Sequence, residues 1–206
     1  MSTLAHMGLL LIGAALVNNI LLTRFIGMCS FFGVTNEFGT AVGMSLAVGF
    51  VTMMVSFCAW LAYYYVLMPM GVSEFLYIPA FILIIASLVQ FVEMYLRKYS
   101  PPLYRSMGIY LPLITTNCAV LAAATEAVKP GFFKMGMTYN FTLAEALVYT
   151  LGIVLGYAFA MLAFSALRER LDLAPVPASM KGSPMAFITA GLMSLGYIGI
   201  ASLFGL

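Results

Sequence analysis

Charged side chains are scarce in this sequence. Only 8% of its 206 residues are Asp, Glu, Lys or Arg, whereas a soluble domain has about 25%. So few charges cannot cover the surface of a water-soluble domain. A net charge of +2 also excludes the basic stripe of a nucleic-acid-binding protein, so no nucleic-acid partner is expected. A disordered chain is excluded as well, because disorder requires low hydrophobicity.

Several motifs of soluble chemistry are missing too. The 3 cysteines are too few for a disulfide scaffold, and no cluster-binding ferredoxin run is present. The sequence has no P-loop and no dinucleotide-binding glycine fingerprint after a predicted strand. We therefore expect this chain to bind neither NAD nor flavin. The first basic residue is Arg24, after the first apolar run, so we expect no cleaved signal peptide.

Hydrophobic residues, in contrast, make up 64% of the chain and predict an integral membrane protein. A transmembrane helix needs about 20 apolar residues, and the runs are too continuous for the alternating strands of an outer-membrane barrel. Six segments fit, and we predict an all-α, polytopic fold of six transmembrane helices in a single membrane domain, residues 1–206. The segments extend from about Met7 to Val34, Thr40 to Met68, Phe75 to Leu96, Met107 to Val128, Leu143 to Leu167 and Met185 to Phe204.

Basic residues in the loops predict the orientation, because short basic loops stay in the cytoplasm. The loops after the third and fifth segments carry Arg97, Lys98, Arg105, Arg168, Arg170 and Lys181. The loop after the fourth segment carries only Lys129 and Lys134. We therefore predict that both termini lie on the non-cytoplasmic side.

The first and fourth segments are predicted to be interrupted helices. A continuous helix over the first would be about 42 Å long, whereas the hydrocarbon layer is about 30 Å thick. Polar residues, Gly and Pro inside a span mark breaks, which survive in a membrane only where protein or a cavity satisfies the freed backbone groups. The first segment contains Asn18, Asn19, Thr23, Arg24, Gly27 and Gly33 around Cys29, and the fourth contains Pro112, Thr115, Thr116 and Asn117 before Cys118.

These two segments open the two halves of a three-plus-three chain. Because three spans is an odd number, the second half must run inverted with respect to the first. We predict an inverted repeat whose halves are residues 4–97 and 107–205. Irregular segments at matching positions of inverted repeats indicate a functional site near the membrane midplane.

Cys29 and Cys118 lie at the two predicted breaks, where they would approach the midplane from opposite faces. A cysteine in a membrane helix can be a simple small hydrophobe, or these two thiols can share a ligand. Iron–sulfur clusters and structural zinc usually take four ligands, so a related partner would have to supply two more. His6 is far from both cysteines in sequence, and Cys58 lies mid-span without a break, so we interpret Cys58 as a packing residue.

The residues around both breaks resemble a known family. Its members include the A-type subunit of the Rnf ion-translocating ferredoxin:NAD oxidoreductase and the E-type subunit of the sodium-pumping NADH:quinone oxidoreductase. The matching stretches cover most of the chain and are Val17-Asn18-Asn19, Gly27-Met28-Cys29 with Phe32-Gly33-Val34, Leu111 to Leu121, Arg168 to Leu171, and Ile188 to Ser194. The stretch that contains Cys118 is the most specific of them.

The resemblance implies a subunit of an ion-translocating oxidoreductase in the bacterial inner membrane, with no substrate-binding site of its own. It implies a 2Fe–2S cluster held by Cys29 and Cys118 together with two cysteines of a homologous partner, the E-type subunit of the complex. Electrons would cross the membrane between flavin and iron–sulfur subunits, coupled to the movement of sodium or protons.

Arg24 and three acidic residues remain to be interpreted. Arg24 precedes Cys29 by five residues and either raises the reduction potential of the cluster or extends to the lipid headgroups. Glu93, Glu126 and Glu145 each lie near a predicted membrane interface, where snorkelling or helix capping explains them. We therefore predict no ion site at these three residues, although acids inside a membrane are candidates in general.

Two other functions fit the same pattern of spans. A secondary transporter also uses inverted repeats with broken helices, but it would contain no iron. A structural anchor for redox partners would tolerate loss of the cysteine thiols while still being needed for assembly. Iron content and the effect of cysteine substitutions distinguish these alternatives from the electron carrier.

Overall fold

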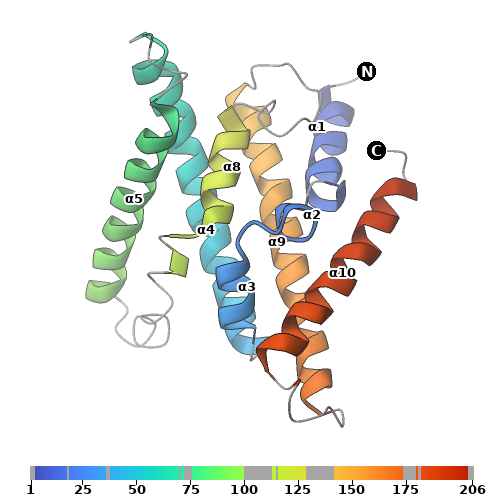
Figure 1. Ribbon diagram of the computed structural model, residues 1–206. Helices are drawn as coiled ribbons and strands as arrows, with labels where there is room; N and C mark the ends of the chain where they lie inside the picture. The colour runs from blue at the N-terminus through green and yellow to red at the C-terminus, as the bar shows by residue number, and fades with distance from the viewer. Residues whose placement is uncertain are drawn as a thin grey trace. The chain divides into compact units, whose positions relative to one another are not determined.

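The computed structural model describes residues 3–17, 19–35, 38–69, 71, 76–99, 113–114, 116–128, 142–173, 180 and 182–203. Within these ranges all regular elements are helices, and no strand occurs (Figure 1). The prediction of an all-α protein is confirmed for this part of the chain.

In the described part of the chain, three helices are long and apolar enough to cross a membrane. They are α4 (Phe38–Ala62) with its π-helical continuation η2 (Tyr63–Leu67), α5 (Tyr77–Tyr99) and α9 (Leu143–Asp172). They coincide with the second, third and fifth predicted segments. Two shorter apolar helices, α8 (Cys118–Val128) and α10 (Ser183–Leu203), lie in the fourth and sixth segments.

The first segment is interrupted, as predicted. It consists of α1 (Thr3–Ile12), the π-helical η1 (Gly13–Val17), α2 (Ile20–Arg24) and α3 (Met28–Val34). Figure 1 shows these pieces in blue as separate short helices rather than as one rod. In the fourth segment, α8 begins only at Cys118, after Thr116 and Asn117, which are not helical. Pro112 and Thr115 lie outside the described residues.

Local sequence explains where several of these helices begin and end. Thr142 precedes α9, and the carboxylate of Glu145 accepts its backbone N–H at 3.0 Å, which is half of a capping box. Gly182, at φ 89°, precedes the Ser183-Pro184 start of α10, where a proline costs no hydrogen bond. η2 ends two residues before Pro69, which cannot continue a helix.

The described residues group into two compact units. One comprises residues 1–47 and 152–206, in which α2 packs against α10, and its core includes Leu22, Phe31 and Phe164. The other comprises residues 48–151, in which α5 packs against α8 around Phe81 and Val120. The inverted repeat of residues 4–97 and 107–205 stays a prediction.

Large apolar side chains cover much of the outside of these helices. Leu46, Leu83 and Leu195 are each about 70% exposed in the isolated chain, as expected for side chains that contact lipid or another subunit. The rings of Trp60 and Tyr64 pack at 4.4 Å near the end of α4. Because Trp and Tyr collect at the headgroup level, this pair indicates a membrane boundary there.

Candidate functional site

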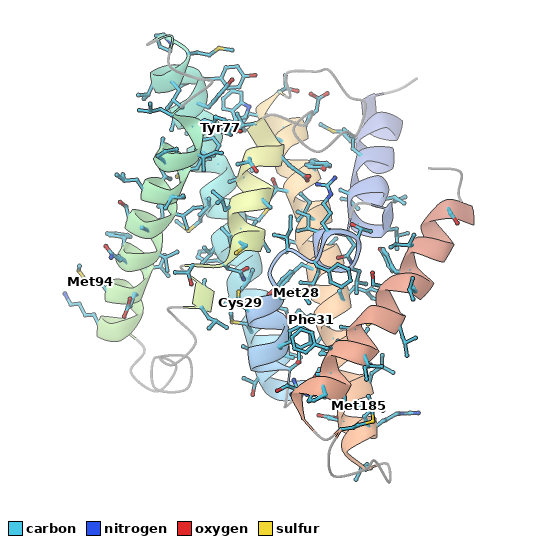
Figure 2. The ribbon with its side chains drawn as sticks, in the orientation of Figure 1. Met28, Cys29, Phe31, Tyr77, Met94 and Met185 are labelled. Carbon is cyan, nitrogen blue, oxygen red and sulfur yellow. The ribbon has the colours of Figure 1, made fainter. Side chains whose placement is uncertain are left out.

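The chain reaches α3 through a turn with two residues in the left-handed region. Phe25 has φ 54° and Gly27 has φ 94°. Glycine adopts this conformation freely, whereas for a phenylalanine it is unfavourable by about 1–2 kcal/mol. The backbone N–H groups of Phe25 and Ile26 both donate hydrogen bonds to the carbonyl of Ile20, and these bonds end α2. The turn places Cys29 as the second residue of α3, and Figure 2 labels it there beside Met28 and Phe31.

Asn19 organises the earlier part of the same break. Its Oδ1 accepts the N–H of Leu21 at 3.1 Å and thereby caps α2. Its Nδ2 donates to the carbonyl of Gly156 on α9 at 2.8 Å. The side chain is almost completely buried, so both ends of its amide replace hydrogen bonds that water cannot supply there.

Side chains of α9 and α10 satisfy the carbonyls that the broken segment leaves free. This agrees with the requirement that irregular backbone in a membrane be compensated by surrounding protein. The donors are Tyr197 Oη to Ala15 at 3.2 Å, Ser194 Oγ to Leu22 at 2.7 Å, Arg168 Nη1 to Phe32 at 3.0 Å and Ser165 Oγ to Thr35 at 3.3 Å.

Two glycines of α9 allow the broken segment to approach its backbone. A Cβ at Gly152 would lie 2.7 Å from the Cβ of Ala14, and one at Gly156 would lie 2.7 Å from the carbonyl oxygen of Ala15. These glycines are four residues apart and therefore lie on one face of the helix, as in the small-residue motif of membrane helix pairs.

Helix α3 is docked on α9 along its whole length. Near its start, the hydroxyls of Ser30 and Tyr157 are 2.8 Å apart. In the middle, the rings of Phe31 and Phe164 stack with their centroids 4.0 Å apart. At its end, Arg168 donates to the Phe32 carbonyl, as described above. The segment that carries Cys29 is thus fixed by contacts with residues more than 120 positions away in sequence.

The second break lies directly before Cys118. Asn117 is buried and outside the helix, and its Oδ1 accepts the N–H of Ala119 at 3.0 Å. Cys118 is the first residue of α8, and most of the helix behind it is buried alanine and valine. Asn117 therefore caps α8 in the same way that Asn19 caps α2.

The thiols of Cys29 and Cys118 are free and exposed, whereas Cys58 is only partly exposed within α4. Cys29 belongs to the first compact unit and Cys118 to the second. That the two share one site stays a prediction. No group of three or more His, Cys, Asp or Glu residues that could hold a metal ion occurs in the described part of the chain.

The three acidic residues have different surroundings. Glu126 is 1% exposed, and its Oε2 accepts the hydroxyl of Tyr149 at 2.9 Å. The expectation that Glu126 snorkels to an interface is therefore wrong, because its side chain is packed inside the protein. Glu145 does cap a helix, as expected, and Glu93 is partly exposed near the end of α5.

Arg24 is the last residue of α2 and is partly exposed. Its two interpretations, tuning of a cluster and contact with headgroups, both stay predictions. The side chain of His6 lies outside the described residues.

Most residues that hold the first break in place were not predicted from the sequence. Asn19 stands out as a polar interruption, but its partner Gly156 does not, nor do Tyr157 and Tyr197. One signal was available, because Gly152 and Gly156 are spaced four residues apart in an apolar run. The hydroxyl donors have no local signature, since they act on backbone far away in sequence.

Comparison with known proteins gives one consistent result. A family model described as "Rnf-Nqr subunit, membrane protein" matches residues 7–204. The A-type subunit of the ion-translocating oxidoreductase complex from Syntrophotalea carbinolica is 48% identical over 195 residues, which are 95% of this chain and 96% of that protein. The proteins of the same name from Vibrio cholerae and Aliivibrio fischeri are each 46% identical, with the same coverage of both chains.

Proposed function

Because this chain belongs to the Rnf-Nqr family of membrane-protein subunits, we propose that it carries electrons across the membrane through a 2Fe–2S cluster shared with a homologous partner protein. Like its relatives, this chain is a multi-pass membrane subunit of an ion-translocating oxidoreductase complex. The observation that supports a shared cluster is the position of two free, exposed thiols, each at the start of a helix that follows a break.

The residues fit such a cluster in their chemistry. A 2Fe–2S cluster takes four thiolates, and Cys29 with Cys118 would supply two. The exposure of both thiols leaves them accessible to a second protein, so the partner, the E-type subunit of the complex, would supply the other two. Cys58 is not assigned a ligand role, because it lies within continuous helix without a break beside it.

The cluster, when bound, would supply a one-electron carrier at the membrane midplane and so divide one long electron transfer into two shorter ones. The chain's own residues hold the ligands in place. The stack of Phe31 on Phe164 and the bond from Arg168 fix α3, while Asn117 fixes the start of α8.

The proposal also includes the membrane topology of the chain and the cofactors that other subunits would bind. Six spans in an inverted three-plus-three repeat would place both termini on the non-cytoplasmic side of the bacterial inner membrane. Flavin, NAD and ferredoxin would bind to other subunits of the complex, and the ion moved is sodium or a proton. Lipid would contact the exposed apolar faces.

The test is electron-spin resonance of the purified complex with Cys29→Ser, Cys118→Ser and, as a matched control, Cys58→Ser. We expect one 2Fe–2S signal and electron transfer to be lost in the first two variants and kept in the third. If all three variants retain the signal and turnover, the chain does not hold a cluster through these thiols. A secondary transporter or a structural anchor for the redox subunits would then explain its broken helices better.

A further inference from the structure

Ser30, the residue after Cys29, is hydrogen-bonded to a tyrosine of α9. Its side chain is 0% exposed, and its Oγ donates to the carbonyl of Gly27 at 2.9 Å. The same Oγ lies 2.8 Å from the hydroxyl of Tyr157, which is 4% exposed. A serine hydroxyl has one proton, which here is given to Gly27, so the Tyr157 hydroxyl donates to Ser30.

This bond connects the turn before Cys29 to a rigid part of α9. Tyr157 follows Gly156, whose carbonyl accepts the amide of Asn19 and whose lack of a side chain allows the contact with Ala15. One turn of α9 therefore fixes both the entry to α2 and the entry to α3. Ser30 in turn holds Gly27, which has a positive φ and begins the turn into α3.

We propose that Tyr157 is a positioning residue for Cys29, which acts through Ser30 to hold the ligand turn and to raise the reduction potential of the bound cluster. This inference rests on the proposed function. Its electrostatic part follows from the direction of the bond, since the positive end of the Tyr157 O–H dipole points toward the residue next to the ligand. Positive potential near an iron–sulfur cluster favours the added electron, and low dielectric strengthens the effect.

The experiment is a redox titration, followed by electron-spin resonance, of the whole complex with Tyr157→Phe. The signal to follow is the one that Cys29→Ser removes. We expect Tyr157→Phe to keep its iron and to lower the reduced-to-oxidised ratio at a fixed potential about threefold, a shift of about 28 mV at 59 mV per tenfold. Ser30→Ala should shift the potential in the same direction, and adding Tyr157→Phe to Ser30→Ala should cause no further shift.

Tyr149→Phe is the matched control, because it removes another buried tyrosine hydrogen bond from the same helix. It should leave the potential unchanged. The inference is overturned if the potential of Tyr157→Phe stays at the wild-type value, if Tyr149→Phe shifts it equally, or if the shift persists in the Ser30→Ala background. It is also overturned if Tyr157→Phe loses its iron in an assembled complex, since the role would then be structural. Should Tyr157→Phe not assemble, Ser30→Ala alone decides in the same way.

The proposed function fails by a different result. If the wild-type complex has no signal that Cys29→Ser removes, the chain carries no cluster, whatever the tyrosine variants do. A signal that Cys29→Ser removes but Tyr157→Phe does not shift leaves the cluster in place and removes only the role of Tyr157.

Discussion

Asn19 illustrates how one polar side chain can make a helix break stable in a membrane. Its carbonyl oxygen replaces the missing acceptor at the start of α2, and its amide nitrogen binds the carbonyl of Gly156. Thr23 also donates two hydrogen bonds to the backbone carbonyl of Asn19, from its N–H at 2.9 Å and from its Oγ1 at 2.7 Å. The polar pattern of the sequence predicted a break here, but the specific partners came only from the structure.

Asn19→Ala should destabilise the chain by about 1–3 kcal/mol, because a buried carbonyl and a helix start lose their partner together. The measurement is the temperature at which half of the chain leaves the assembled complex. Ser202→Ala is the control, since its hydroxyl bonds the Gly199 carbonyl at an exposed site and should matter little. Equal thermal stability of the two variants would mean that Asn19 does not hold the break.

Glu126 is the clearest residue-scale departure from expectation. Position near the end of an apolar segment suggested exposure at an interface, but packing in three dimensions decides burial, and the residues on both sides of it are buried too. A sequence pattern without the neighbouring helices could not reveal this.

Tyr149→Phe should lower the stability of the folded chain by about 1–3 kcal/mol, because the buried carboxyl of Glu126 loses a hydrogen-bond donor. The double variant Glu126→Leu, Tyr149→Phe should recover much of that loss, since neither polar partner then remains buried. Thermal denaturation of the purified complex measures both. Losses that simply add in the double variant would contradict the bond between these two residues.

At the scale of elements, the second, third, fifth and sixth apolar segments were predicted from their length and composition, and a helix lies in each. The interruption of the first segment was predicted from its polar residues and glycines, and it is confirmed. The number of short helices in the first segment could not be predicted, nor could the contacts that hold them. The side chains of α9 and α10 that donate hydrogen bonds to this segment follow it by more than 120 residues in the sequence. Hydrophobic pattern reports local structure, whereas these contacts depend on the tertiary fold.

Glycine substitutions in α9 test whether its close packing on the broken first segment stabilises that segment. Gly156→Ala should destabilise the chain by about 1–3 kcal/mol, since its Cβ would overlap backbone that cannot easily move. Gly191→Ala in α10 is the matched control, because nothing lies within 4 Å of its Cβ position. Alanine there should be neutral or stabilising, as alanine favours helix over glycine.

Thermal denaturation of the complex with each variant makes this comparison. Destabilisation by Gly191→Ala equal to that by Gly156→Ala would indicate a general sensitivity to glycine replacement. The close approach of α9 to residues 11–15 would then not be what stabilises the first break.

For the whole molecule, the main prediction concerns topology. Basic residues after the third and fifth segments predict that these loops are cytoplasmic and that both termini are not. Single cysteines at Ser2, Ser106 and Thr138 should report this in spheroplasts treated with an impermeant maleimide, with the unmodified chain as background. Labelling is expected at positions 2 and 138 and not at 106. The reverse pattern would show that the chain has the opposite orientation.

The central claim is that Cys29 and Cys118 hold one cluster together. Its most direct test is the iron and acid-labile sulfide content of the purified complex, compared among wild type, Cys29→Ser, Cys118→Ser and the double variant. One shared 2Fe–2S cluster predicts that each single variant loses two irons and two sulfides, and that the double variant loses no more. Unchanged iron in either single variant, or losses that add in the double variant, would contradict it.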